Sequence, residues 1–209
     1  YSIFHDSCRI FICYILLEVV EIIWITGDTH GGWIHRLNMD SFPEQREMTK
    51  EDYVIVLGDF GIWRDSPQQR WYLNWLEERN FTTLFIDGNH ENYDILDAYP
   101  VEEWHGGKVH FIKPSVIHLM RGQVFDIDDL KFFTFGGAAS HDISDGVLEI
   151  DDPRVKEWRD DPDKMYRINH TSWWEREMPD EEEMDEGIKN LAEHDNKVDF
   201  ILTHCTASS

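Results

Sequence analysis

The chain has 209 residues, of which 41% are hydrophobic and 13% aromatic, and this composition excludes an intrinsically disordered protein because it supplies ample material for a packed core. A net charge of −23 at pH 7 repels polyanions and argues against long nucleic acid as a partner. The same charge leaves a small phosphorylated substrate open, since bound divalent cations reverse the local field around a site.

Residues 1–20 differ from the rest of the chain, and we expect them to be an accessory or non-native extension before a domain that spans residues 21–209. The apolar run at residues 10–17 is too short for a membrane span and is followed by glutamates, so we expect neither a signal peptide nor a membrane anchor. The three cysteines form no CxxC motif, which argues against a disulfide framework or a thiolate zinc site. We therefore expect a reduced, cytoplasmic protein.

Four short apolar runs predict buried strands, and each ends at a turn-forming or polar residue. They cover residues 22–26, 53–57, 83–86 and 200–203. Two helix starts lie between them. Ser66-Pro67 combines an N-cap residue with a proline at the first helical position, and Asp180 opens a helix with a capping box. The apolar face of that second helix is predicted from residues at helical spacing, which are Met184, Ile188 and Leu191. The alternation of strands and helices predicts a layered α/β fold.

Two further segments carry patterns of their own. Residues 108–135 contain four strand-like segments separated by turns, which predicts a second, mainly antiparallel sheet. Residues 142–185 hold 16 Asp and Glu against 6 Lys and Arg and show little periodicity. We expect this acidic segment to be a partly ordered excursion that borders the functional site, with a cap over the site as the alternative.

Polar residues of metal-binding type follow each of the four predicted strands. Because ligands gather outside the carboxyl ends of strands in open α/β sheets, we expect these side chains to meet. Asp28, Asp59 and Asn89 are separated by 31 and 30 residues, which is one strand–helix unit each. Any one of these motifs alone has an ordinary structural explanation, but their joint occurrence favours a site. The candidates are Asp28, His30, Asp59, Asn89, His90 and His204.

These side chains offer carboxylate, amide and imidazole donors, which suit Mn, Fe or Zn. A carboxylate can bridge two cations, and two metal ions about 3.5–4 Å apart clamp a phosphate and activate a hydroxide between them. The sequence contains no GxSxG motif, and Cys205 has no evident activating partner, so no alternative nucleophile competes with this interpretation.

Taken in order, the motifs resemble the first four signature blocks of the calcineurin-like metallophosphoesterases. The blocks are Gly27-Asp28-Thr29-His30-Gly31, Gly58-Asp59, Gly88-Asn89-His90-Glu91 and Thr203-His204. The segment from Phe135 to Ser140 also resembles the Gly-Gly-Ala segment that many members carry between the third and fourth blocks. The resemblance covers residues 22–204. It implies a four-layer α/β/β/α sandwich of the metallo-dependent phosphatase type, with the site at the carboxyl ends of the first sheet's strands.

The resemblance also implies a metal-dependent hydrolysis of a phosphomonoester or phosphodiester, by in-line attack of a hydroxide that bridges two divalent ions, with Mn the first choice. Metal ligands would be Asp28 and His30 on the first ion, Asp59 on both, and Asn89 and His204 on the second. His90 would not bind metal; it would stabilise the transition state and protonate the leaving oxygen as general acid. Glu91 would orient a neighbouring group.

Two candidates carry weaker signals. Arg64 lies five residues after Asp59 and is a candidate for contact with a phosphate, with a surface arginine as the equal alternative. His141 follows the Gly-Gly-Ala segment and is a candidate for lining the site, with an exposed loop histidine as the equal alternative.

The sequence departs from the family pattern at its end. Members usually carry a final Gly-His-x-His element that supplies one more ligand to each metal, and no such element follows His204. We expect a fragment of a longer product with reduced metal affinity and activity, and a natural truncation is the alternative. A non-catalytic binding scaffold with an incomplete metal site is the competing function, although a scaffold has no need of His90. The second block also lacks the Asp-Arg-Gly continuation of the protein phosphatases, so the substrate class stays open.

Overall fold

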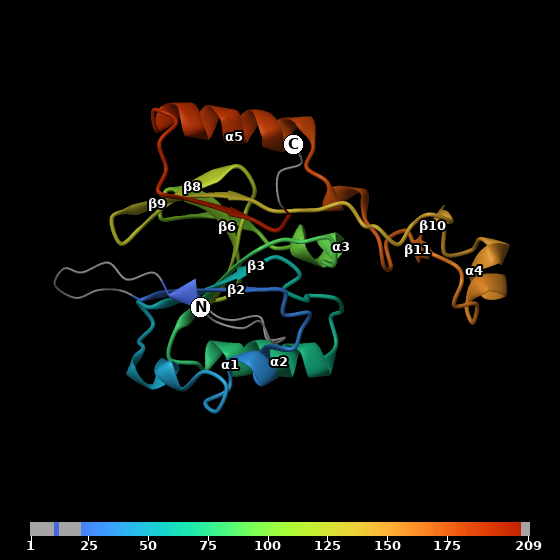
Figure 1. The fold of residues 1–209 in the computed structure, drawn as a ribbon, viewed down its shortest axis with the longest axis horizontal. Helices are drawn as coiled ribbons and strands as arrows, with labels where there is room; N and C mark the ends of the chain where they lie inside the picture. The colour runs from blue at the N-terminus through green and yellow to red at the C-terminus, as the bar shows by residue number, and fades with distance from the viewer. Residues whose placement is uncertain (1–10, 13–21, 206–209) are drawn as a thin grey trace, which may run out of the picture.

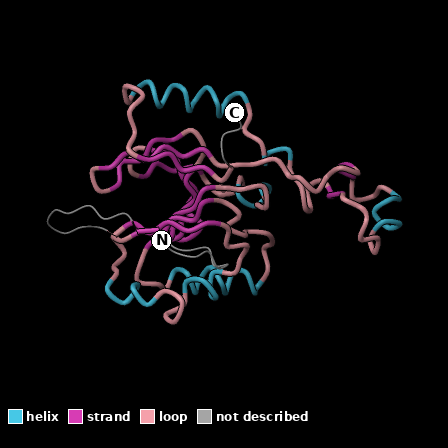
Figure 2. Tube along the Cα trace, viewed as in Figure 1, coloured by secondary structure: helices cyan, strands magenta, loops and turns pink. Residues whose placement is uncertain are grey.

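The computed structural model describes residues 11–12 and 22–205, and these form four layers. One group of helices covers a seven-stranded sheet, a three-stranded sheet packs on the opposite face, and a long helix covers the three-stranded sheet (Figure 1). The tube view shows the same order, with helices outermost on both sides and strands between them (Figure 2). The predicted α/β/β/α sandwich is confirmed. No helix in the described ranges has both the length and the apolar character needed to cross a bilayer.

The seven-stranded sheet has the order β1-β2-β3-β4-β7-β6-β5. Its central strands β2, β3, β4 and β7 are parallel, while β1, β6 and β5 pair antiparallel at the two sides. The strands are β1 (Phe11–Ile12), β2 (Ile23–Gly27), β3 (Tyr53–Leu57), β4 (Thr82–Ile86), β5 (Val101–Trp104), β6 (Gly107–Lys113) and β7 (Val116–Leu119). Three of the four predicted strands are therefore neighbours in this sheet.

The central strands are apolar almost throughout because both of their faces are buried. In β3, Val54 and Val56 belong to the core beneath the helices, whereas Ile55 belongs to the core between the two sheets. All three side chains are at most 1% exposed. The sheet is thereby held rigidly from both sides, and its strand ends are fixed relative to one another.

The helices α1 (Trp33–Leu37) and α2 (Pro67–Glu77), together with the 3-10 helix η1 (Pro43–Glu47), cover the outer face of this sheet. The Ser66 hydroxyl accepts a hydrogen bond from the backbone amide of Gln69 at 3.1 Å, so the helix start predicted at Ser66-Pro67 is confirmed. Leu73 and Leu76 of α2 join the core on this side, and they anchor the helix on the sheet.

The second sheet has the order β12-β9-β8, with β12 parallel to β9 and β8 antiparallel to it. Its strands are β8 (Gln123–Ile127), β9 (Leu130–Phe135) and β12 (Phe200–Thr203). The prediction that residues 108–135 form one separate sheet is wrong in part. Residues 116–119 pair with β4 and extend the first sheet, and only the segments after Gly122 enter the second. Local strand patterns do not reveal which partner strand a segment will choose.

Helix α5 (Glu181–Glu193) covers the second sheet, and its predicted capping box between Asp180 and Glu183 is present. Its predicted apolar face is wrong in part, because Met184 and Ile188 are 42% and 67% exposed, whereas Leu191 is half-buried. The helix instead approaches the sheet through Gly187, where an added Cβ would lie 3.2 Å from the Cα of Gly122. This close backbone approach turns the apolar side chains outward.

Residues 142–185 contain the parallel pair β10 (Gly146–Leu148) and β11 (Tyr166–Ile168), helix α4 (Pro153–Trp158) and the 3-10 helix η2 (Glu175–Glu177). Part of this segment extends away from the layered body (Figure 1). It returns to the short helix α3 (Tyr93–Leu96), where His170 and Trp174 both bind the carboxylate of Asp94. The division of the chain at residue 21 stays a prediction, and residues 1–10 and 13–21 lie outside the described part.

Candidate metal centre

Three neighbouring parallel strands end at one level and direct their following loops to one edge of the sheet. Gly27, Leu57 and Ile86 are register partners at the carboxyl ends of β2, β3 and β4. The candidate ligands come one to three residues later, so the parallel arrangement itself brings the motifs together.

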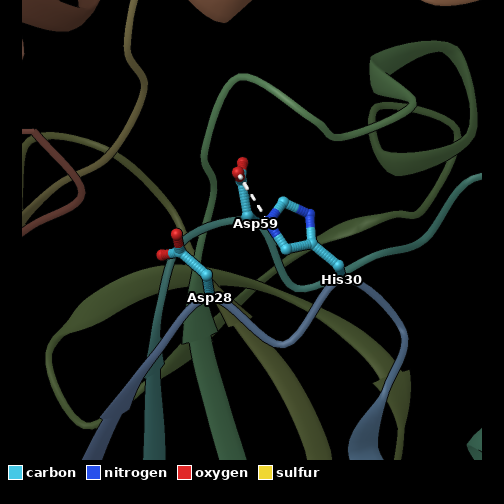
Figure 3. A group of neighbouring side chains, drawn as sticks. All are labelled: Asp28, His30 and Asp59. Carbon is cyan, nitrogen blue, oxygen red and sulfur yellow. Dashed lines mark ion pairs between the residues drawn. The ribbon is translucent and has the colours of Figure 1, made fainter. Parts of the chain in front are cut away.

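The carboxylates of Asp28 and Asp59 and the imidazole of His30 form a compact group at this edge (Figure 3). One ligand atom from each residue lies within 4.8 Å of the other two. The Nε2 atom of His30 is 3.6 Å from Oδ2 of Asp59. Asp59 is buried while Asp28 and His30 are exposed, so the group is open on one side.

His204 reaches the same group from the second sheet. Its Nε2 atom lies 3.5 Å from Oδ1 of Asp59, and its Nδ1 atom lies 3.7 Å from Oδ1 of Asp28. The Nδ1–H group of His204 donates a hydrogen bond to the carbonyl oxygen of Leu57 at 2.8 Å, which leaves Nε2 free to act as a ligand. The expectation that the site lies at the carboxyl ends of the first sheet's strands holds for three of the four strands. The fourth strand, β12, belongs to the second sheet.

Asn89 is oriented by a chain of hydrogen bonds behind it. Its Nδ2 group donates to the Ser140 hydroxyl at 3.2 Å, and that hydroxyl donates to Oε2 of Glu177 at 2.7 Å. The backbone amide of Ser140 donates to the other oxygen of Glu177. With its nitrogen engaged, the amide of Asn89 has its Oδ1 available as a ligand.

Backbone geometry in these loops is unusual. Asp59 and His30 have φ values of +48° and +46°, in the left-handed region that non-glycine residues adopt uncommonly and that Asp and His adopt more often than most. The amides of Thr29 and His30 donate to the carbonyl of Asp59, and this bonding links the first loop to the second. At Gly88, an added Cβ would lie 2.2 Å from Oδ1 of Asp59. The first and third loops thus pack closely against the second loop at Asp59.

Glu91 joins the third loop to the second. Its buried carboxylate accepts hydrogen bonds from the backbone amides of Phe60, Gly61 and Ile62. Burial raises the pKa of Glu91 to about 8, although the amides of Gly61 and Phe60 favour the carboxylate. Glu91 thus links the third loop to the segment that follows Asp59, and its orienting role in the site stays a prediction.

Behind the third loop lies a buried network around Asp87. Arg121 donates from Nε to Oδ2 of Asp87 at 2.7 Å, and His118 lies 3.2 Å from the other oxygen. Burial raises the pKa of Asp87, but Arg121 and His118 outweigh it and hold that pKa well below its ordinary value. Because Asp87 directly follows β4 and Arg121 precedes β8, this ion pair fixes the third loop against the second sheet.

His90 lies beside the metal-binding group, with its ring 5.2 Å from that of His30. Its backbone amide donates to Oδ1 of Asp59 at 2.9 Å, and its carbonyl accepts from the indole of Trp63 at 2.8 Å. The guanidinium of Arg167 lies 3.2 Å from Nε2 of the imidazole. Burial chiefly lowers the pKa of His90, Asp59 raises it, and Arg167 and His30 lower it further.

Arg167 and its partner Asp142 were missed in the sequence. Asp142 accepts from Nε and Nη2 of Arg167 at 2.7 and 3.0 Å, which fixes the guanidinium plane beside His90. Both residues belong to the acidic segment, where an arginine and an aspartate carry no distinguishing local signal. The contact between Arg167 and His90 spans 77 positions, and only the fold reveals it.

The family match agrees with this geometry. The family model described as calcineurin-like phosphoesterase matches residues 22–205, which is most of the chain. The chain belongs to the calcineurin-like phosphoesterase family. Comparison with curated proteins gave no match, and comparison with solved structures gave none.

The donor set of this calcineurin-like phosphoesterase fits divalent metal ions. Two carboxylates face two imidazoles, and no Lys or Arg of the described residues forms an ion pair with Asp28 or Asp59. Carboxylates gathered without a cationic partner repel one another, and a divalent cation relieves that repulsion. Asp28, His30, Asp59 and His204 are the residues that would hold the metal, and the role of Asn89 as a ligand stays a prediction.

The two weaker candidates have different surroundings in the phosphoesterase structure. Arg64 lines a cleft that His90 and Gly31 also line. His141 is exposed on the loop after Ser140 and is not among the described residues that line this cleft. The roles of both residues stay predictions.

Proposed function

We propose that this calcineurin-like phosphoesterase hydrolyses a small phosphomonoester or phosphodiester with two divalent metal ions, Mn²⁺ being the first choice and Fe or Zn the alternatives. The observation that carries the proposal is the convergence of Asp28, His30, Asp59 and His204, from three different loops, beside the imidazole of His90. When bound, the ions supply charge neutralisation for the phosphoryl oxygens and activation of the attacking water for in-line displacement.

Each proposed site residue has a defined task. The buried carboxylate of Asp59 would hold both ions, Asp28 and His30 would hold one of them, and Asn89 and His204 would hold the other. His90 stabilises the transition state and delivers a proton to the leaving oxygen, a task suited to an imidazole that is placed next to the ligands but is not one of them. Arg167 fixes the orientation of that ring.

The proposed compartment is the cytoplasm, and the proposed partner is a small phosphorylated molecule. The odd number of cysteines, three, argues against a disulfide framework and supports the first proposal, and the net charge of −23 supports the second by disfavouring long polyanions.

Metal content and hydrolysis test the proposal together. Elemental mass spectrometry would measure bound metal, and p-nitrophenyl phosphate and bis-p-nitrophenyl phosphate would be assayed with Mn²⁺ and with EDTA. We expect bound metal and Mn²⁺-dependent hydrolysis, with the faster ester indicating mono- or diesterase activity. Asp59→Asn alters a proposed ligand, so both bound metal and turnover should fall in this variant. A protein that binds no metal and hydrolyses neither ester would contradict the proposal.

A further inference from the structure

A cleft of about 460 Å³ opens beside His90 and is separate from the metal-binding group. None of Asp28, His30, Asp59, Asn89 or His204 lines it, whereas His90 does. His90 therefore stands between the ligands and the cleft. We propose that this cleft binds the leaving group of the substrate, and that it takes a leaving group with a planar ring and a negative charge. This inference rests on the proposed function, because it uses His90 as the proton donor to the leaving oxygen.

The position of His90 decides which part of the substrate the cleft receives. A general acid must lie within hydrogen-bond reach of the leaving oxygen. The phosphoryl group is held at the ligands on one side of His90, so the remainder of the leaving group extends to the other side. That side is the cleft, whose volume lies within the usual range of about 300–1,000 Å³ for small-molecule sites.

The cleft has two walls from distant parts of the chain. One wall is formed by residues between Trp63 and Tyr72, a stretch that includes the start of α2. The other wall belongs to the acidic segment and consists of Arg167, Thr171, Ser172 and Trp174. The second wall is held on the body of the fold by Asp94, which accepts from the indole of Trp174 at 2.8 Å.

Aromatic side chains make the cleft suitable for a planar ring. Trp33, Trp63, Tyr72 and Trp174 all line it. Trp33 and Trp174 are nearly buried, but Trp63 is 42% exposed. The indole of Trp63 is not free to turn away, since its N–H donates to the carbonyl of His90 at 2.8 Å. A fixed, exposed indole next to the general acid offers a surface on which a ring of the leaving group can stack.

The charge of the lining is opposite to that of the protein. Asp and Glu make up 42 of the 209 residues, yet none of the described residues that line the cleft is acidic. Two arginines line it instead. Arg167 is paired with Asp142, but no other described residue binds the guanidinium of Arg64. Arg64 is therefore available to an anionic group on the leaving group.

Leaving groups of matched reactivity test the inference. Benzyl and ethyl phosphate both release an unactivated primary alcohol, and 4-carboxybenzyl phosphate adds a negative charge to the ring. We expect kcat/KM in the order 4-carboxybenzyl, benzyl, ethyl. Trp63→Ala should reduce the ratio of kcat/KM for benzyl phosphate to kcat/KM for ethyl phosphate about tenfold, whatever it does to both values together. Arg64→Ala should reduce the ratio of kcat/KM for the carboxybenzyl ester to kcat/KM for the benzyl ester about threefold. If the enzyme prefers diesters, the methyl diesters of the same alcohols replace the monoesters.

Trp71→Ala is the matched control, because Trp71 is 57% exposed on α2 and does not line the cleft. Calorimetry with the corresponding benzyl, carboxybenzyl and ethyl phosphonates, which are not hydrolysed, measures their affinities for the Mn²⁺-loaded protein and so tests the cleft without turnover. Equal affinity for benzyl- and ethylphosphonate, or an unchanged preference in Trp63→Ala, would overturn the inference. Hydrolysis of p-nitrophenyl phosphate tests the proposed function by itself. A failure of the proposed function can therefore be distinguished from a failure of the inference about the cleft.

Discussion

The guanidinium of Arg167 lies 3.2 Å from Nε2 of His90, and both carboxylate oxygens of Asp142 hold the same guanidinium in place. An element of the acidic segment thus reaches the imidazole beside the metal-binding group. The segment contributes to the site and not only to the surface charge of the protein.

Replacing Arg167 with Ala should lower turnover about 10- to 100-fold, because an unsupported imidazole samples unproductive orientations. Bound metal should stay unchanged, since Arg167 contacts no proposed ligand, and Arg167→Lys should recover part of the loss. The measurements are kcat and metal content. Arg154→Ala is the control in the same segment, where the side chain is 49% exposed, pairs with Asp152 and lies over the ring of Trp158, away from His90. An equal loss in both variants would contradict a specific role for Arg167.

Replacing His90 with Ala should reduce turnover by about 10²–10⁴, which is the usual contribution of a general acid. Metal content should be nearly unchanged, because the contact of His90 with Asp59 is made by its backbone amide and survives the substitution. Steady-state kinetics and elemental mass spectrometry measure the two effects. Loss of metal in this variant would show that His90 is a ligand.

Replacing Gly58 with Ala should weaken metal binding about tenfold or more and lower stability. The added Cβ would lie 2.2 Å from Nδ1 of His204, at a residue whose φ is +84°, so the imidazole must move. Gly146→Ala is the matched control, because Gly146 has φ +108° but no atom within 4 Å of an added Cβ. It should cost only the backbone strain of about 1–2 kcal/mol. Metal titration and thermal unfolding would distinguish the two, and equal metal affinity in both variants would contradict the prediction.

The buried His110 should make the protein less stable in acid. Burial, and then the neighbouring His118, lower the pKa of His110 from 6.5 to about 4, while Asp97 and Asp87 oppose this shift and Arg176 adds to it. Because the unfolded chain binds the proton first, the free energy of unfolding contributed by this group falls as the pH drops from about 6.5 to about 4.

Urea unfolding at several pH values measures this effect. His110→Gln should show a flatter pH dependence than the wild type between these two pKa values, because the titrating group is gone. His35→Gln, at an exposed position of α1, is the control and should keep the wild-type dependence. A dependence unchanged in His110→Gln would contradict the assignment.

Local sequence determined the elements that carry the chemistry. The apolar runs before Asp28, Asp59, Asn89 and His204 are strands in the structure, and the motifs stand where these strands end. Such runs are recognisable because a strand buried on both faces must be apolar throughout. The capping box at Asp180 and the helix start at Ser66 are equally local, since they depend on residues three positions apart.

Tertiary structure alone decided how these elements combine. Strand β7 joins β4 rather than β8, and the helix that begins at Glu181 packs through Gly187 rather than through Met184 and Ile188. The pairing of Arg167 with His90 and the entry of His204 from the second sheet also depend on contacts between residues far apart in the chain. Periodicity reports which side chains share a face of one element, but the partner of that face is selected by the packing of all layers together.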